Sequence, residues 1–150
     1  VGCLAVVVIT QKDIDNLSNK ISSVDRVKAQ YSVDQGNTAS VLAHHLVAFN
    51  NGDPDEFIAD YADDAVLIME DKTVVGKEGI FAVAKEVFGP SGAFRPGTFI
   101  FTMGVQKVEQ QTAYMTWTYE AGPAKLAGSD VFEIRNGKIV MQAVVMKPTL

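Results

Sequence analysis

Hydrophobic positions in the first part of the chain recur at steps of three and four residues. Between positions 12 and 32 these apolar residues are Ile14, Leu17, Ile21, Val24 and Tyr31. The spacing predicts an amphipathic helix, and its narrow, nearly heptad seam suits packing on a second copy of the chain. Gly36-Asn37 interrupts the pattern. We therefore predict a linker there, between an N-terminal segment, residues 1–36, and a domain, residues 37–150.

The helical spacing continues beyond this linker. A second helix is predicted to begin near Thr38 or Ser40 and to end at Asn50-Asn51-Gly52. Asp53-Pro54 predicts the start of a short helix that reaches Tyr61, because Asp caps helices and Pro fits their first turn.

One strand and one further helix complete the first half of the predicted domain. Asp63-Asp64 is interpreted as a helix terminus and turn, and residues 66–69 as the strand. Another helix is predicted to follow Gly76, with a loop rich in glycine and proline after it.

Beyond residue 98 the apolar positions alternate with polar ones, which is the period of a half-buried strand. Asn136-Gly137 separates two such runs and predicts a tight hairpin that pairs roughly residues 128–135 with 138–147. Helices followed by a meander of long antiparallel strands predict an α+β domain, with helices packed on one face of a curved sheet.

Composition and charge narrow the functional classes. The chain has 150 residues, of which 47% are hydrophobic and 21% charged, as expected for one globular domain. A net charge of -5 without a basic stripe argues against a nucleic-acid surface. The chain lacks zinc-type Cys/His spacing and glycine-rich phosphate-binding motifs. We therefore expect no metal and no cofactor.

The chain opens with the apolar run VGCLAVVVIT, which contains its single cysteine, Cys3. Val-Gly-Cys matches the end of a lipobox, the signal for lipid attachment to cysteine. The run also fits the remnant of a signal peptide, or a segment that docks on the domain or on a partner. Membrane contact is expected only if Cys3 is lipidated, and both a cytoplasmic and an exported location stay open.

One carboxylate falls on the interior face of a predicted strand. Asp130 shares that face with Phe132 and Ile134. Burial raises the pKa of a carboxyl group, so Asp130 can serve as an acid or base, or donate a hydrogen bond to a developing oxyanion. The alternative is a structural role, in which Asp130 bonds backbone amides or pairs with Lys125 or Arg95.

The only two histidines are adjacent in the sequence. The helical pattern places His45 on or near the buried stripe and His44 closer to solvent. His45 is therefore either a packed core residue or a group that faces a pocket. The side chains expected to line an apolar pocket, or else to fill the core, are Tyr61, Met69, Met115, Trp117, Tyr119 and Phe132.

Two stretches resemble a known family. AFNNGDPDEFIADYADDAVLIMEDKTVVGKEGI and GSDVFEIRNGKIV are similar to the SnoaL-like branch of the nuclear transport factor 2-like superfamily, which includes ketosteroid isomerases and polyketide cyclases. The resemblance covers about residues 38–147. It implies a cone-shaped half-barrel whose helices pack on the concave face of the sheet. It also implies an apolar pocket at the mouth and a homodimer.

The resemblance also implies roles for two residues. Asp130 falls where polyketide cyclases carry an acid/base Asp and where isomerases carry a protonated oxyanion-hole Asp. His45 falls where isomerases carry an oxyanion-hole Tyr. The general base of the isomerases falls nearest Met69, which takes up no proton, with Glu70 and Asp71 one and two residues further on.

Two functions are consistent with this pattern. The first is a pocket for a small apolar ligand that undergoes proton transfer next to a carbonyl. Asp130 would be the acid or oxyanion donor and His45 its partner. The second is a non-enzymatic ligand-binding or dimerisation module. An enzyme predicts both residues at an open cavity, whereas a module predicts a filled cavity and a fully hydrogen-bonded Asp130.

Overall fold

The computed structural model describes residues 10–149, apart from the side chain of Ile21. The chain divides into two compact units between Val33 and Asp34. Cys3 and its apolar run, for which lipid attachment or a signal was predicted, lie outside the described residues. In the described part, no helix combines the length and the apolar run that a membrane span requires.

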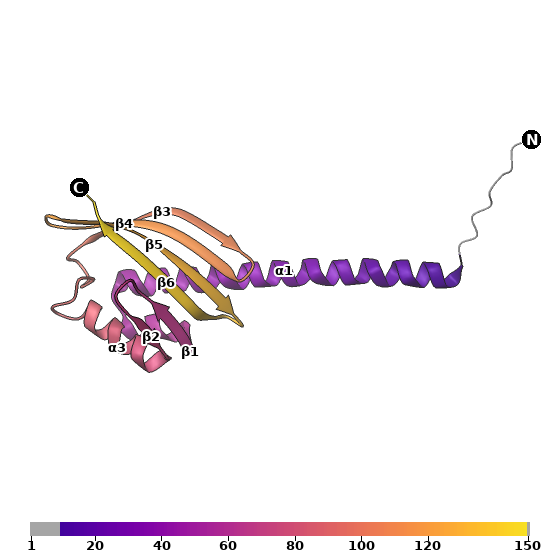
Figure 1. Ribbon diagram of the computed structural model, residues 1–150, viewed down its shortest axis with the longest axis horizontal. Helices are drawn as coiled ribbons and strands as arrows, with labels where there is room; N and C mark the ends of the chain where they lie inside the picture. The colour runs from indigo at the N-terminus through magenta and orange to yellow at the C-terminus, as the bar shows by residue number, and fades with distance from the viewer. Residues whose placement is uncertain (1–9, 150) are drawn as a thin grey trace, which may run out of the picture. The chain divides into compact units, whose positions relative to one another are not determined.

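Helices come first and strands follow, as the hydrophobic periods predict (Figure 1). The helices are α1 (Gln11–Asn51), α2 (Pro54–Ala59) and α3 (Lys77–Phe88). The strands are β1 (Tyr61–Ile68), β2 (Thr73–Val75), β3 (Ile100–Glu109), β4 (Thr112–Ala121), β5 (Ala124–Arg135) and β6 (Lys138–Pro148). They form one curved, unclosed sheet in the order β2-β1-β6-β5-β4-β3, with helices on its concave face. The predicted α+β class is confirmed.

Neighbouring strands of the sheet are antiparallel except β1 and β6, which run parallel. The predicted hairpin between β5 and β6 is present, and Ile134 pairs with Ile139 beside its turn. Asn136 and Gly137 form the turn with φ angles of 50° and 72°. Two successive positive φ angles fit a type I′ turn, whose twist matches that of the two strands.

The predicted linker at Gly36-Asn37 is wrong, because α1 runs through it without interruption. A glycine inside a helix costs about 1 kcal/mol, which neighbouring contacts offset. The side-chain amide of Gln35 donates to the carbonyl of Val108 at 3.0 Å, and the hydroxyl of Thr38 donates to the carbonyl of Gln110 at 2.6 Å. These two bonds hold this part of α1 against the turn between β3 and β4.

The predicted turn at Asp63-Asp64 is also wrong, since both residues lie within β1 and are exposed. The helix predicted to reach Tyr61 ends before it, and Tyr61 starts the strand fully buried. Pairing with β6 is irregular between Tyr61 and Val66. The two acids therefore lie in a strand, although their local sequence is typical of a turn.

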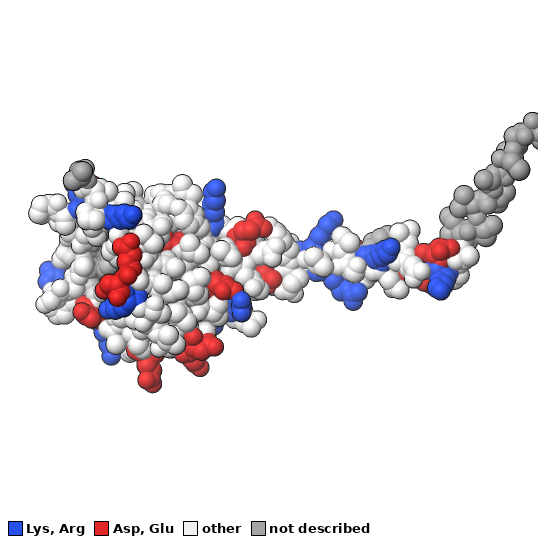
Figure 2. Space-filling model, in the orientation of Figure 1, with Lys and Arg blue, Asp and Glu red and all other residues white. Residues whose placement is uncertain are grey.

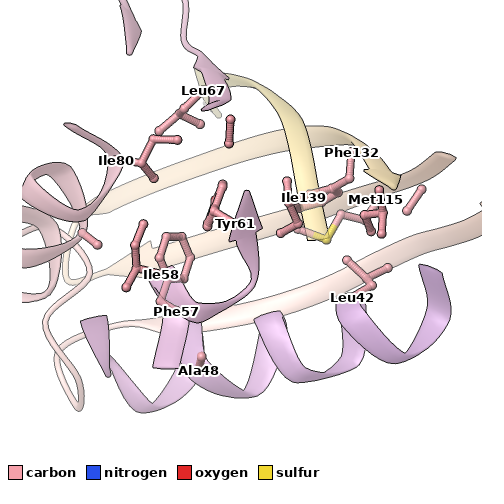
Figure 3. Packing of buried hydrophobic residues seen from close by; sticks show 14 of the residues in the cluster. Leu42, Ala48, Phe57, Ile58, Tyr61, Leu67, Ile80, Met115, Phe132 and Ile139 are labelled. Atoms are coloured by element: carbon pink, nitrogen blue, oxygen red, sulfur yellow. The ribbon is translucent and has the colours of Figure 1, made fainter. Parts of the chain in front are cut away.

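The core of residues 34–149 lies between the concave face of the sheet and the helices (Figure 3). Leu42 of α1 points toward Met115 of β4, and Phe57 comes from α2. Burying a side chain of this size stabilises the fold by about 1.5–3 kcal/mol. On the face of this unit drawn in Figure 2, acidic and basic side chains are interspersed without a continuous basic area.

Candidate functional site

A cavity of about 110 Å³ lies within this core. Its wall consists mainly of apolar side chains from all three helices and four of the strands, and only four residues bring polar groups to it. These four residues are His45, Trp117, Asp130 and Gln142. An apolar cavity with a few convergent polar groups is the usual form of a small-molecule site.

Asp130 lies on β5 with its carboxyl group held by two neutral donors. The indole Nε1 of Trp117 donates to Oδ1 at 2.9 Å, and the amide Nε2 of Gln142 donates to Oδ2 at 2.9 Å. Trp117 comes from β4 and Gln142 from β6, the two strands that flank β5. A carboxylate can accept about four hydrogen bonds, so Asp130 keeps capacity for a ligand.

A second layer fixes the amide of Gln142. The hydroxyl of Tyr61 donates to its Oε1, so Gln142 accepts from Tyr61 and donates to Asp130. Tyr61 is fully buried at the start of β1. The chain Tyr61–Gln142–Asp130–Trp117 therefore joins four strands of the sheet through side chains.

A glycine makes room for the indole ring. Gly128 lies directly opposite Trp117 in the antiparallel pairing of β4 and β5. A Cβ at Gly128 would stand 2.2 Å from Cζ2 of Trp117, a distance that side chains do not adopt. Because Gly128 has no Cβ, the indole ring can lie over β5. Its nitrogen then reaches Asp130, two residues after Gly128.

Burial controls the acidity of this network. It raises the pKa of Asp130, against the lowering effect of the bonds from Trp117 and Gln142 and of the charge on His45. Burial also raises the pKa of Tyr61, with further contributions from the charges of Asp130 and Asp60. Asp130 is therefore easier to protonate than an exposed aspartate, while Tyr61 stays a neutral donor.

His45 stands at the cavity wall, only 2% exposed, among aromatic rings. Its ring centroid lies 4.3 Å from that of Phe57, 5.5 Å from Tyr61 and 5.4 Å from Phe132. Within the described residues Nδ1 of His45 is buried without a hydrogen-bond partner, and it lies 3.7 Å from Oδ2 of Asp60. A buried, unpaired ring nitrogen is costly, which marks His45 as a group with unused hydrogen-bonding capacity.

The joint between α1 and α2 brings Asp60 to the histidines. Gly52 ends α1 with a φ of 59°, and the bonds from Gly52 to Phe49 and from Asp53 to Ala48 form a Schellman motif. Asp53 then caps α2, as the sequence predicts, by accepting bonds from the backbone amides of its first turn. Asp60 follows the last residue of α2.

The sequence model of the SnoaL-like domain matches residues 42–142, which is more than half of the chain. The chain belongs to the SnoaL-like family. The resemblance predicted from its motifs is confirmed. A search of curated protein sequences gave no match.

Solved structures share the fold of this SnoaL-like protein at low identity. A Kribbella flavida DSM 17836 protein assigned as a ketosteroid isomerase is 16% identical (TM-score 0.66; 78% of this chain and 82% of that chain). A steroid delta-isomerase from Pseudomonas aeruginosa is 20% identical (0.60; 75% and 81%). An M. tuberculosis LEH-like epoxide hydrolase is 18% identical (0.61; 75% and 84%). These similarities show the nuclear transport factor 2-like fold and no more.

The SnoaL-like domain places the predicted pocket residues in two layers. Met69, Met115 and Trp117 line the cavity. The other three predicted residues lie behind the lining: Tyr61 bonds Gln142, Phe132 contacts the ring of His45, and Tyr119 packs on Phe94 and Phe99.

Neither predicted cationic partner bonds Asp130. Lys125 pairs with Glu120 at 3.9 Å, and Arg95 donates to the carbonyl of Pro90. Both donors that hydrogen-bond to Asp130 are neutral. In the described part of the chain, no group of three or more His, Cys, Asp or Glu residues is placed to hold a metal ion.

Sequence reasoning undervalued Gln142 and did not single out Asp60. An amide side chain carries no charge that marks it as a site residue, and the place of Gln142 beside Asp130 depends on the register of β5 and β6. Asp60 lies sixteen residues after His44 and directly follows the last residue of α2. Of the polar residues in this network, Asp130 is the one whose inward position follows from the alternation of apolar and polar residues along its strand.

Proposed function

We propose that this SnoaL-like domain binds a small, largely apolar molecule through a carbonyl group and catalyses proton transfer at the carbon next to it. Enolisation, isomerisation and aldol-type closure all begin with that step. The observation that carries the proposal is a single buried carboxyl group, Asp130, held by neutral donors at the polar corner of an otherwise apolar cavity.

The lining supports an apolar ligand with one polar end. Apolar side chains such as Leu67, Ile80 and Phe101 make up most of the cavity lining. Burying apolar ligand surface there contributes roughly 25 cal/mol per Å². The polar groups lie together, so a ligand oxygen is directed to one corner of the site.

Asp130 is suited to act on that oxygen. Because burial raises its pKa, the protonated form is more accessible than in an exposed aspartate. A protonated Asp130 donates its hydrogen bond to the carbonyl oxygen, and the negative charge of the enolate strengthens that bond. Trp117 and Gln142 keep the carboxyl group in position throughout.

His45 is suited to move the proton. Its ring is held by Phe57, Tyr61 and Phe132, and its Nδ1 has no hydrogen-bond partner within the described residues. An imidazole ring can both accept and donate a proton, as a general acid or base must. The site therefore has a proton carrier, although the position of the isomerases' base nearest Met69 carries none.

Hydrogen–deuterium exchange tests the proposal without knowledge of the natural substrate. The bicyclic ketone 2-tetralone is incubated with the protein in deuterated water, and loss of its α-proton signal is followed by NMR. The wild-type protein should accelerate the exchange, and Asp130→Asn should reduce this acceleration by about 100-fold or more. Glu133→Gln, on the same strand, is the matched control and should retain it.

Two results would contradict the proposal. One is a wild-type protein that does not accelerate exchange in 2-tetralone or in a panel of smaller and larger apolar ketones. The other is an Asp130→Asn variant that exchanges as fast as the Glu133→Gln control. Folding of each variant is checked by circular dichroism.

A second candidate function, dimerisation, is favoured by the helical segment before Val33. Ile14, Leu17 and Val24 repeat at heptad spacing along it and are 52%, 60% and 50% exposed. In a parallel pair of such helices, Lys20 of one copy would face Asp25 of the other across the seam. Figure 2 shows charged side chains distributed along this segment with uncharged surface between them. A second copy of the chain is the occupant that this pattern fits.

A further inference from the structure

Two acids and two histidines alternate in a row that leads to the cavity wall. Glu56 and Asp60 come from α2 and its end, and His44 and His45 from α1. Nε2 of His44 lies 2.9 Å from Glu56 Oε2, and its Nδ1 lies 2.8 Å from Asp60 Oδ1. Nδ1 of His45 lies 3.7 Å from Asp60 Oδ2. The row begins at exposed Glu56 and ends at the cavity.

Asp60 is fixed at the centre of this row. Asp60 is 8% exposed. Its backbone amide donates to the carbonyl of Ile58 at the end of α2, and its backbone carbonyl accepts a bond from the amide of Ile139 at 2.7 Å. His44 closes on it from the solvent side, with ring-nitrogen distances of 2.8 and 2.9 Å to the two carboxylate oxygens. The position of the carboxylate is therefore set independently of His45.

Asp60 stays ionised at neutral pH. Burial opposes its charge, but the contacts with His45 and His44 outweigh burial and lower the pKa of Asp60. An ionised carboxylate accepts hydrogen bonds and donates none. The nitrogen of His45 that faces Asp60, Nδ1, is therefore the one that carries the proton in the neutral ring.

We propose that Asp60, clamped by His44, is a positioning residue that fixes the Nδ1–H tautomer of His45, so that the unprotonated Nε2 serves the cavity as the general base. This role rests on the function proposed above. The α-proton of the ketone passes to Nε2, and the electron pair of the broken C–H bond forms the enolate. The imidazolium then faces the negative charge of Asp60, and its proton returns to a carbon of the ligand.

The ionisable groups around His45 fit this role. Asp60 faces Nδ1 of His45, and His44 precedes His45 on α1. Tyr61, on β1, contacts the His45 ring, and Asp130, on β5, interacts with His45 electrostatically. The charge of Asp60 favours an imidazolium formed during the reaction, and a protonated, neutral Asp130 does not oppose it, whereas a charged His44 opposes it through the same carboxylate. Closure of the 3.7 Å gap to hydrogen-bond distance would follow protonation of His45.

Nitrogen-15 NMR of the imidazole rings tests the tautomer directly. The chain contains two histidines, and His44→Gln leaves only the signals of His45. In the neutral wild-type ring, Nε2 should show the shift of an unprotonated nitrogen and Nδ1 that of a protonated one. Asp60→Asn should raise the Nε2–H population several-fold. Glu56→Gln, which removes only the exposed acid, should leave the His45 signals in the wild-type pattern.

The exchange assay provides the second arm. For Asp60→Asn we expect kcat to fall about tenfold or more with KM nearly unchanged, since the variant alters His45 and not the lining. A wild-type His45 with its proton on Nε2 overturns the proposal even if Asp60→Asn fails to fold. A folded Asp60→Asn with the wild-type tautomer also overturns it. If the tautomer is set by Asp60 but no ketone exchanges, the positioning role stands and the proposed function fails.

Discussion

The indole nitrogen of Trp117 lies 2.9 Å from the carboxyl oxygen of Asp130, which is two residues beyond the residue paired with Trp117. The paired residue is Gly128, and the indole ring lies over it. The absence of a side chain at Gly128 therefore allows the indole of Trp117 to reach and hydrogen-bond the buried carboxyl group of Asp130.

Gly128→Ala should separate Trp117 from Asp130. The added carbon meets the ring at 2.2 Å, so the ring must move, and overpacking of this kind costs about 1–3 kcal/mol. Trp117 is the only tryptophan, so its fluorescence reports the change directly, and urea unfolding measures the loss of stability. Gly36→Ala is the matched control, because a carbon there meets no atom within 4 Å and Ala favours the helix. Wild-type emission in Gly128→Ala would contradict this account.

Asp130→Asn should become more stable relative to the wild type as pH rises. The pKa of Asp130 is raised by burial, so its contribution to stability is full below the ordinary value of 3.8 and is lost as pH rises through the folded-state value. Asn cannot ionise and escapes that loss. Urea unfolding of both proteins between pH 4 and pH 8 should show a difference in unfolding free energy that grows with pH. A constant difference would mean that burial does not shift this group.

His44→Gln should destabilise the protein more at pH 5 than at pH 8. The hydrogen bond to Asp60 and the negative charge of that carboxylate raise the pKa of His44 above 6.5, and the hydrogen bond to Glu56 raises it further. Its contribution is therefore full below pH 6.5 and is lost as pH rises through the raised value. The ring is half exposed, so the loss at pH 5 is at most about 1 kcal/mol. Unfolding curves at the two pH values measure it, and equal losses would contradict the pairing.

The double substitution Leu17→Ser and Val24→Ser should convert a dimer to a monomer. Both side chains lie on the heptad seam, and removing them should raise the dissociation constant at least about tenfold. Light scattering after size exclusion measures the mass of each species. Val33→Ser is the control, because Val33 is 55% exposed and lies on the side of the helix away from the seam. A monomeric wild-type protein, or a double variant that stays dimeric, would rule out this interface.

Strand periodicity was sufficient to place Asp130 on the interior face. Met115, Trp117 and Tyr119 are buried in alternation on β4, and Asp130, Phe132 and Ile134 on β5. A period of two is a local property, so it can be read without knowledge of which strands pair.

The partners of Asp130 were not predictable in the same way. Trp117 and Gln142 reach it because β4 and β6 pair with β5 in one register, and a shift of one residue would turn each side chain to the other face. The predicted cations, Lys125 and Arg95, lie elsewhere. Asp60 meets His44 only because Gly52 and Asp53 fold α2 back on α1, which neither helix specifies alone.

The parallel pairing of β1 with β6 has a consequence for the order of folding. β3 to β6 are joined by successive hairpins and form contacts between residues close in the sequence, whereas Leu67 must find Gln142 across most of the domain. Long-range pairings form slowly because the intervening loop must first be closed. We therefore expect the meander to fold first and β1 to dock last. Tyr61 arrives with β1, so a folding intermediate would hold Asp130 and Trp117 together before Gln142 is locked in place.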